Sequence, residues 1–206
     1  KFQGRSKGHR TYSYSKAAGE LEVRRGIEKG LDAVILKPTG IIGPYDFKPS
    51  YFGRAILAFA QGKIPALVRG GFDWVDVRDV VAGMITAQQN APSGSSYILS
   101  GHWRSVQAVA DQVATLTGVP APRIVVPLWA AYLGLPLMKL LANLQKQEPL
   151  YTRVSLDALG SDQSISRDLA EQELNFIPRP FEETIATAVH WFADNGYLRL
   201  PSHNLG

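Results

Sequence analysis

Apolar positions recur with helical and strand spacings in turn along most of the chain. Residues 12–29 have helical spacing, and Gly30 stands where helices commonly end. Residues 32–36 form a short apolar run with the length and β-branched content of a buried strand in a parallel sheet. The same criteria predict helices at residues 50–61, 79–89, 106–118, 166–174 and 181–195. The first four of these helices have candidate N-caps, which are Ser50, Asp79, Ser105 and Ser166. Strands are predicted at residues 66–68, 72–77 and 97–99. This alternation predicts the α/β class.

Two segments depart from the alternation. Residues 38–44 hold two prolines and two glycines, which exclude a helix there. After a proline-broken link at residues 119–122, residues 125–144 are strongly apolar, but prolines, a glycine and a lysine interrupt them before the ~20 residues that a membrane span needs. We expect a buried or surface-docking helix, with a helix lying on a bilayer as the alternative.

Composition narrows the classes of function. The hydrophobic content of 45% and the charged content of 19% describe a globular protein with a core. The net charge of +4 is spread along the chain, which argues against a nucleic-acid partner. The sequence has no cysteine, and its four histidines lie far apart, so we expect no metal site. The chain opens at Lys1 in a polar stretch, which suggests a fragment or a processed product.

A tyrosine and a lysine one helical turn apart are the candidate catalytic groups. Tyr12 and Lys16 share one face of the first predicted helix. A tyrosine hydroxyl titrates near pH ~10, and a neighbouring ammonium favours the phenolate. Such a pair can act as acid and base in the interconversion of a hydroxyl and a carbonyl, and the ammonium can also hold a ribose hydroxyl. Two solvated side chains at this spacing are the alternative interpretation.

The surrounding motifs resemble the extended short-chain dehydrogenases/reductases. The string YxxSKAxxE from Tyr12 to Glu20 is similar to the active-site helix of that family, and KPTGIIGP at residues 37–44 looks like its sixth strand and nicotinamide-side loop. FDWVDVRDVV at residues 72–81, the turn and strand at 94–101 and the tail at 170–191 follow in family order. The tail resembles the dihydroflavonol-reductase-like and 3β-hydroxysteroid-dehydrogenase-like branch.

The resemblance implies the following roles. Tyr12 would be the catalytic acid/base, and Lys16 would activate it and bind the nicotinamide ribose. Pro38 and the backbone of Thr39, Gly40 and Ile41 would line the nicotinamide, with turn formation as the alternative for Pro38 and Gly40. Ser50 would lie near the cofactor phosphates or the substrate entrance, or would only cap a helix.

A pair of acidic residues, Asp76 and Asp79, offers a further candidate. A catalytic carboxylate pair is one interpretation, and helix capping with ion pairing to Arg78 is the one that we favour.

The resemblance covers the C-terminal half of such a protein. The sequence contains no glycine-rich dinucleotide loop after a strand, and the active-site Ser or Thr of the family would precede residue 1. We therefore expect residues 1–118 to be the C-terminal portion of a Rossmann-type domain with interleaved substrate-domain segments, and residues 119–206 to be a smaller, mostly helical substrate domain. A fragment of this kind would be inactive alone.

These observations predict a fragment of an oxidoreductase that interconverts a carbonyl and a secondary alcohol with NADP or NAD. The alternatives are a nucleotide-sugar epimerase or dehydratase of the same superfamily and a non-catalytic binding module with a dehydrogenase-like fold. The apolar residues 125–144 favour a hydrophobic small-molecule substrate, since a sugar diphosphate calls for arginines. The resemblance also implies a cytoplasmic protein and allows a homodimer through the helix that carries Tyr12.

Overall fold

The computed structural model describes residues 10–144, 153–160 and 164–200. Helices and strands alternate along the first part of the chain, and helices dominate after residue 126. The helices are α1 Arg10–Glu28, α2 Tyr51–Ala60, α3 Val77–Asn90, α4 Val106–Thr117, α5 Leu128–Leu144, α6 Arg153–Leu159, α7 Asp168–Leu174 and α8 Phe181–Asp194. The strands are β1 Ile35–Pro38, β2 Gly40–Ile42, β3 Ala66–Val68, β4 Gly71–Asp76, β5 Ser96–Leu99, β6 His102–Ser105 and β7 Ile124–Val126.

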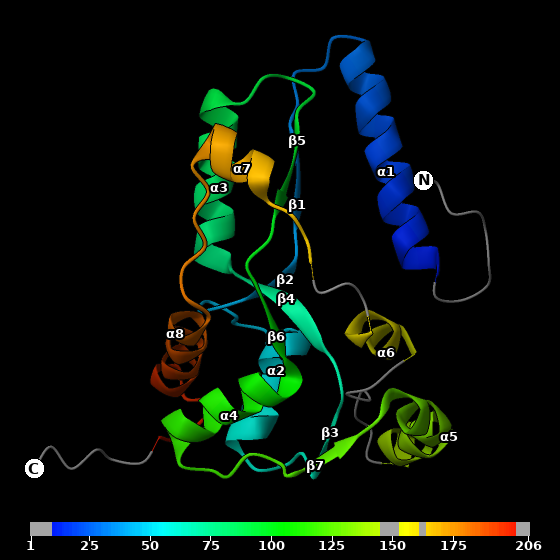
Figure 1. Cartoon of the computed structure of the whole chain (residues 1–206), viewed down its shortest axis with the longest axis vertical. Coiled ribbons are helices and arrows are strands. Elements are labelled where there is room, and N and C mark those ends of the chain that lie inside the picture. Colours follow the sequence, from blue (N-terminus) through cyan, green and yellow to red (C-terminus); the bar gives the residue numbers. More distant parts are fainter. Residues whose placement is uncertain (1–9, 145–152, 161–163, 201–206) are drawn as a thin grey trace, which may run out of the picture.

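A parallel pair of strands, β1 and β5, carries the first layer of the fold. Leu36 pairs with Tyr97 and Pro38 pairs with Leu99. Side chains alternate between the faces of a strand, and this register directs Leu36, Tyr97 and Leu99 to the same face, where they pack with α3 and α7. The opposite face, with Lys37 and Ile98, is turned towards α1 (Figure 1). The pair is therefore buried on one side and half-covered on the other.

A second, mixed sheet lies below the first in Figure 1. The order is β2–β4–β6, with β2 parallel and β6 antiparallel to β4. Helices α2, α4 and α8 pack together beside it around a core that includes Ile56, Val113 and Phe192. The chain passes from the first sheet to the second twice, through Thr39 and through residues 100–101, which places the ends of β1 and β5 beside the start of β2 and β6.

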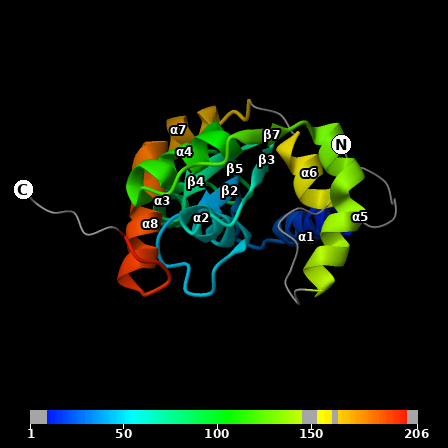
Figure 2. The same cartoon turned by 90° about the horizontal axis from the view of Figure 1, so that it is seen from below.

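A third, smaller unit is built on the parallel pair β3–β7. Helices α5 and α6 cover it, and Val68, Ala131, Leu156 and Leu159 form its core. Figure 2 shows α5, α6 and α1 on one side of the strands and α8 on the other. No described helix is long and apolar enough to cross a membrane.

Most predicted elements are confirmed, with shifts at their ends. Ser50 and Ser105 cap α2 and α4 as predicted, since their hydroxyls accept hydrogen bonds from Gly53 N and Ala108 N, both at 3.1 Å. The cap predicted for α3 is wrong: Asp76, three residues before Asp79, accepts from Arg78 N.

Two other expectations also needed correction. Helix α7 begins after Arg167 with no side-chain cap, although the Ser166 hydroxyl does accept from Asp168 N at 3.2 Å. The strand expected at residues 32–36 instead spans Ile35–Pro38. Strands β2, β6 and β7 and helix α6 were not predicted.

The α/β class is confirmed. The predicted division of the chain into two domains at residue 118 stays a prediction. Helix α7, which follows residue 118, packs against β5 and α3 of the first layer.

Candidate functional site

Helix α1 carries both predicted catalytic residues in its first two turns. The helix runs antiparallel to β1, so its N-terminal half lies beside the carboxyl end of the strand (Figure 1). Lys16 is exposed. The backbone of Tyr12 belongs to α1, while its side chain lies outside the described part of the structure. Ligands of open α/β sheets bind at the carboxyl ends of the strands, which is the end that this half of α1 faces.

An ion pair joins α1 to β1 at this end. The Lys37 ammonium lies 2.9 Å from the Oε1 atom of Glu20, and the Arg24 guanidinium lies 2.8 Å from the same oxygen. The hydrogen bonds from Lys37 and Arg24 hold the pKa of the Glu20 carboxyl below its ordinary value. Lys37 directly precedes Pro38, so the contact lies at the start of the predicted nicotinamide loop.

The loop itself is fixed by a buried carboxylate. Thr39 N donates to Leu99 O at 3.3 Å, and the Thr39 hydroxyl donates to Asp73 Oδ1 at 2.6 Å. Asp73 also accepts from the Ser100 hydroxyl and from Gly101 N, both at 2.8 Å. The Thr39 hydroxyl is therefore hydrogen-bonded within the protein. A ligand at this loop would meet the backbone of Thr39 and the neighbouring residues instead. Asp73 stands in the FDWVDVRD string but had no predicted role; only the structure reveals it.

Close backbone packing explains the glycine after Thr39. A Cβ atom at Gly40 would lie 2.9 Å from Asp73 O, too close for any side chain without a shift. The next residue, Ile41, is 38% exposed although it belongs to a strand. This combination presents the backbone and the side chain of residue 41 at the surface of the site.

A pocket of about 210 Å³ opens beside Ile41. Ile41, Tyr45, Asp46, Ser50 and neighbouring apolar residues from β2, α2, α3 and α8 line it. Ser50 N donates to both carboxylate oxygens of Asp46, at 2.9 and 2.8 Å. Tyr45 has a φ of 69°, an uncommon value for a residue other than glycine, which marks the turn that forms the pocket rim. The structure therefore brings Ile41 and Ser50, which belong to two successive predicted segments, to one pocket.

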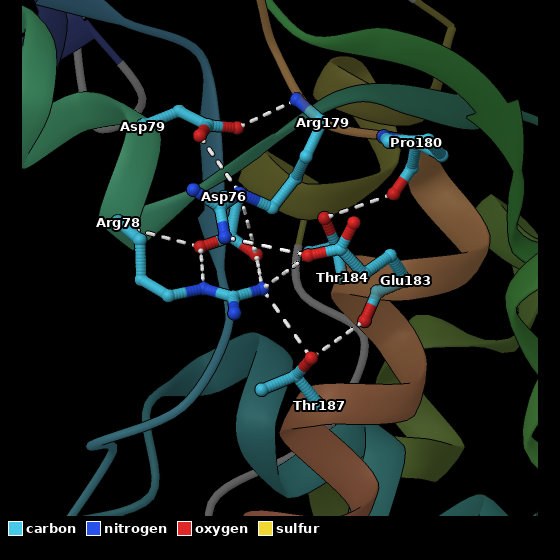
Figure 3. A network of polar contacts seen from close by, with 8 residues as sticks. All are labelled: Asp76, Arg78, Asp79, Arg179, Pro180, Glu183, Thr184 and Thr187. Atoms are coloured by element: carbon cyan, nitrogen blue, oxygen red, sulfur yellow. Dashed lines mark hydrogen bonds and ion pairs between the residues drawn. The ribbon is translucent and has the colours of Figure 1, made fainter.

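The predicted capping and pairing with Arg78 are confirmed for Asp76, whereas Asp79 pairs with Arg179 instead (Figure 3). Asp76 is buried and accepts from Arg78 Nε at 2.9 Å and from a terminal nitrogen of Arg78 at 2.7 Å. Burial raises the pKa of the Asp76 carboxyl, but the side-chain and backbone hydrogen bonds from Arg78 outweigh it, and the pKa lies below its ordinary value. Asp79 accepts from Arg179 N at 2.9 Å and from Arg179 Nε at 2.8 Å. The Asp79–Arg179 pair ties α3 to the residues that directly precede α8.

The predicted site residues thus fall into two groups. Pro38, Thr39, Gly40 and Ile41 form one continuous edge from the end of β1 into β2, and Ser50 faces the same pocket as Ile41. Lys16 and the backbone of Tyr12 lie on α1, which the Glu20 ion pair fastens to that edge. A dinucleotide fits this arrangement at its nicotinamide end, because an exposed backbone edge and a partly apolar pocket meet at the carboxyl end of a parallel strand pair.

No group of three or more histidine, aspartate or glutamate side chains is placed to hold a metal ion in the described residues.

Residues 3–100 match the model of the NAD dependent epimerase/dehydratase family. The chain belongs to this family. The matched residues include α1, the β1–β2 edge and the pocket beside Ile41. Members of this family of extended short-chain dehydrogenases/reductases bind NAD(P) and act on small molecules.

Two relatives are similar over 91% of the chain. One is the "Putative dihydroflavonol 4-reductase" of Synechocystis sp. strain PCC 6803, which is 35% identical over 198 residues, and the other is "Sterol demethylase protein B" of Methylococcus capsulatus, which is 33% identical over 191 residues. The chain spans 56% and 58% of these proteins.

A solved structure agrees with this family membership. The nucleoside-diphosphate-sugar epimerase PA4631 of Pseudomonas aeruginosa is 27% identical and superposes with a TM-score of 0.72 over 95% of this chain and 58% of that protein.

Proposed function

We propose that the protein is an NAD(P)-dependent oxidoreductase that interconverts a carbonyl and a secondary alcohol. The observation that carries the proposal is the fastening of α1, with its Tyr12–Lys16 spacing, to the carboxyl end of β1 through the Glu20–Lys37 ion pair. The family membership and the dihydroflavonol-reductase-like relatives support the same reaction class.

The proposed roles follow from the chemistry of each group. The Tyr12 hydroxyl gives a proton to the carbonyl oxygen in reduction and takes it back in oxidation. The Lys16 ammonium favours the ionised tyrosine and holds a ribose hydroxyl of the cofactor. When bound, NAD(P) supplies or accepts the hydride.

The remaining site residues would hold the cofactor. The backbone from Pro38 to Ile41 orients the nicotinamide ring, since the Thr39 hydroxyl is committed to Asp73. Ser50 contacts the cofactor or the substrate at the pocket that it shares with Ile41. Its hydroxyl accepts from Gly53 N, and its own O–H group can donate to a ligand there.

A hydrophobic substrate is the class that we favour. Trp129 and Leu133, four residues apart on α5, are 68% and 75% exposed, and the chain resembles a protein named for a sterol demethylase system. Exposed large apolar side chains at helical spacing are available to contact an apolar ligand. A cytoplasmic location and a homodimer are also part of the proposal.

A nucleotide-sugar epimerase is the second candidate, supported by the similarity to PA4631. A transfer assay separates the two. With the protein expressed from its complete reading frame, NAD(P)H carrying two deuterium atoms at C4 and a panel of apolar ketones, a reductase puts one deuterium in the secondary alcohol for each NAD(P)H oxidised. Turnover of sugar nucleotides with no net oxidation of added NAD(P)H would contradict the oxidoreductase and support the epimerase.

A further inference from the structure

The contact between Glu20 and Lys37 joins helix α1 to strand β1. The proposed reaction requires this helix and this strand to be aligned. Glu20 lies on α1 and Lys37 on β1, seventeen residues later, and their charged atoms are 2.9 Å apart in a half-exposed setting. Arg24 contacts the same Glu20 oxygen, but it belongs to α1 itself. Only the first of these two contacts therefore ties the helix to the strand.

The position of Glu20 on α1 gives this contact a consequence for the site. Positions 12, 16 and 20 follow one another at four-residue steps, so they lie along one face of the helix. A contact that fixes Glu20 against the strand also fixes the direction in which this face turns. Because Lys37 is the residue before Pro38, the face is directed at the start of the predicted nicotinamide edge.

We propose that Glu20 and Lys37 are positioning residues, which set the rotation and the height of α1 so that positions 12 and 16 of the helix lie beside the carboxyl end of β1. This inference rests on the proposed oxidoreductase function. Neither residue is assigned a contact with the substrate or the cofactor. The depressed pKa of the Glu20 carboxyl agrees with a carboxylate that is ionised and held by cations in the folded protein.

The expected effect falls on catalysis more than on stability. Half-exposed ion pairs contribute little to folding because water screens them. Catalytic geometry is far less tolerant, since a displacement of about 1 Å can cost on the order of 100-fold in rate. We expect a partial release of α1 to lower kcat/KM by about tenfold.

The chain offers a matched control for the test. Lys37→Gln and Arg24→Gln each remove one cation from the same Glu20 oxygen, and only the first breaks the link between helix and strand. In the protein from the complete reading frame, we expect K37Q to lose about tenfold in kcat/KM, R24Q to stay within about twofold, and K37R to recover most of the loss because it keeps the charge.

A second readout does not depend on activity. Backbone amide exchange over residues 14–22 of α1 should be faster in K37Q than in R24Q, since a helix released from its strand opens more often. Equal activity and equal exchange in K37Q and R24Q would overturn the positioning role. If the wild-type protein shows no NAD(P)-dependent turnover, the proposed function fails by itself. In that case faster exchange in K37Q alone upholds the helix-to-strand link, and unchanged exchange overturns it.

Discussion

Asp76 offers the sharpest test of how the fold is held together. Its side chain is fully buried, caps α3 and accepts two hydrogen bonds from the Arg78 guanidinium. In Asp76→Asn the amide oxygen still caps the helix, since Asn is as good an N-cap as Asp. The amide nitrogen, however, meets a guanidinium nitrogen, donor against donor, and the charge that Arg78 binds is lost.

The magnitude follows from these contacts. A hydrogen bond to a charged group contributes about 1.5–3 kcal/mol, and removing one partner of a buried ion pair costs about 3–5 kcal/mol. The Arg78 side chain keeps 27% of its surface exposed and can rehydrate, which brings the expected loss for D76N to about 2–3 kcal/mol. Urea denaturation followed by circular dichroism measures it as a lower midpoint at an unchanged slope.

Glu183→Gln is the matched control. Glu183 contacts Arg78 at 3.5 Å and Arg179 at 3.4 Å but is half exposed, so its loss should cost no more than about 0.5 kcal/mol. If D76N unfolds within about 0.5 kcal/mol of the wild-type protein, or if E183Q is as costly as D76N, the buried Asp76–Arg78 pair does not stabilise the fold as described.

Two further predictions concern acid and the nicotinamide edge. The pKa values of Asp76 and Glu20 are depressed in the folded protein, so their contribution to stability is complete above their unfolded values near ~4 and is lost as the pH falls through the folded values. The unfolding free energy should therefore fall below about pH 4, and less steeply in D76N; equal slopes in the two proteins would contradict this. Thr39→Val removes a donor from the buried Asp73 carboxylate and should lower the unfolding free energy measured in urea by about 1–3 kcal/mol. The control is Thr115→Val, at an exposed hydroxyl that donates to Asp111 O, and it should lower this free energy by no more than about 0.5 kcal/mol. A T39V protein as stable as T115V would show that Asp73 does not need this donor.

Much of the fold could be predicted because its signals are local. The serine caps of α2 and α4 lie within three residues of the amides that they accept, so sequence spacing alone identifies them. The apolar spacings of the helices and of β3, β4 and β5 also depend only on near neighbours. Strands β2, β6 and β7 escaped prediction for separate reasons. Strand β2 lies in a segment punctuated by prolines and glycines, β6 (His102–Ser105) has no apolar run, and β7 merges with the apolar residues 125–144 that were expected to be helical.

The candidate site divides in the same way. The Tyr12–Lys16 spacing and the KPTGIIGP string are contiguous motifs, which the sequence displays directly. The hydrogen bond from Thr39 to Asp73 and the closing of the pocket beside Ile41 by Val77 and Phe192 arise from contacts between residues far apart in the sequence. The misplaced cap of α3 shows the limit of local rules, since both Asp76 and Asp79 suit a helix start. In the structure Asp76 caps the helix, which begins at Val77, and Asp79 pairs with Arg179, which lies 100 residues away along the chain.

The proposed role of Tyr12 is tested by the turnover of Tyr12→Phe in the protein from the complete reading frame. Phenylalanine keeps the ring and removes the proton donor, so we expect a loss of about 10²–10⁴-fold in kcat, with NAD(P)H binding retained. A Y12F protein that reduces its carbonyl substrate within about twofold of the wild-type rate would contradict the assignment of Tyr12 as the acid/base.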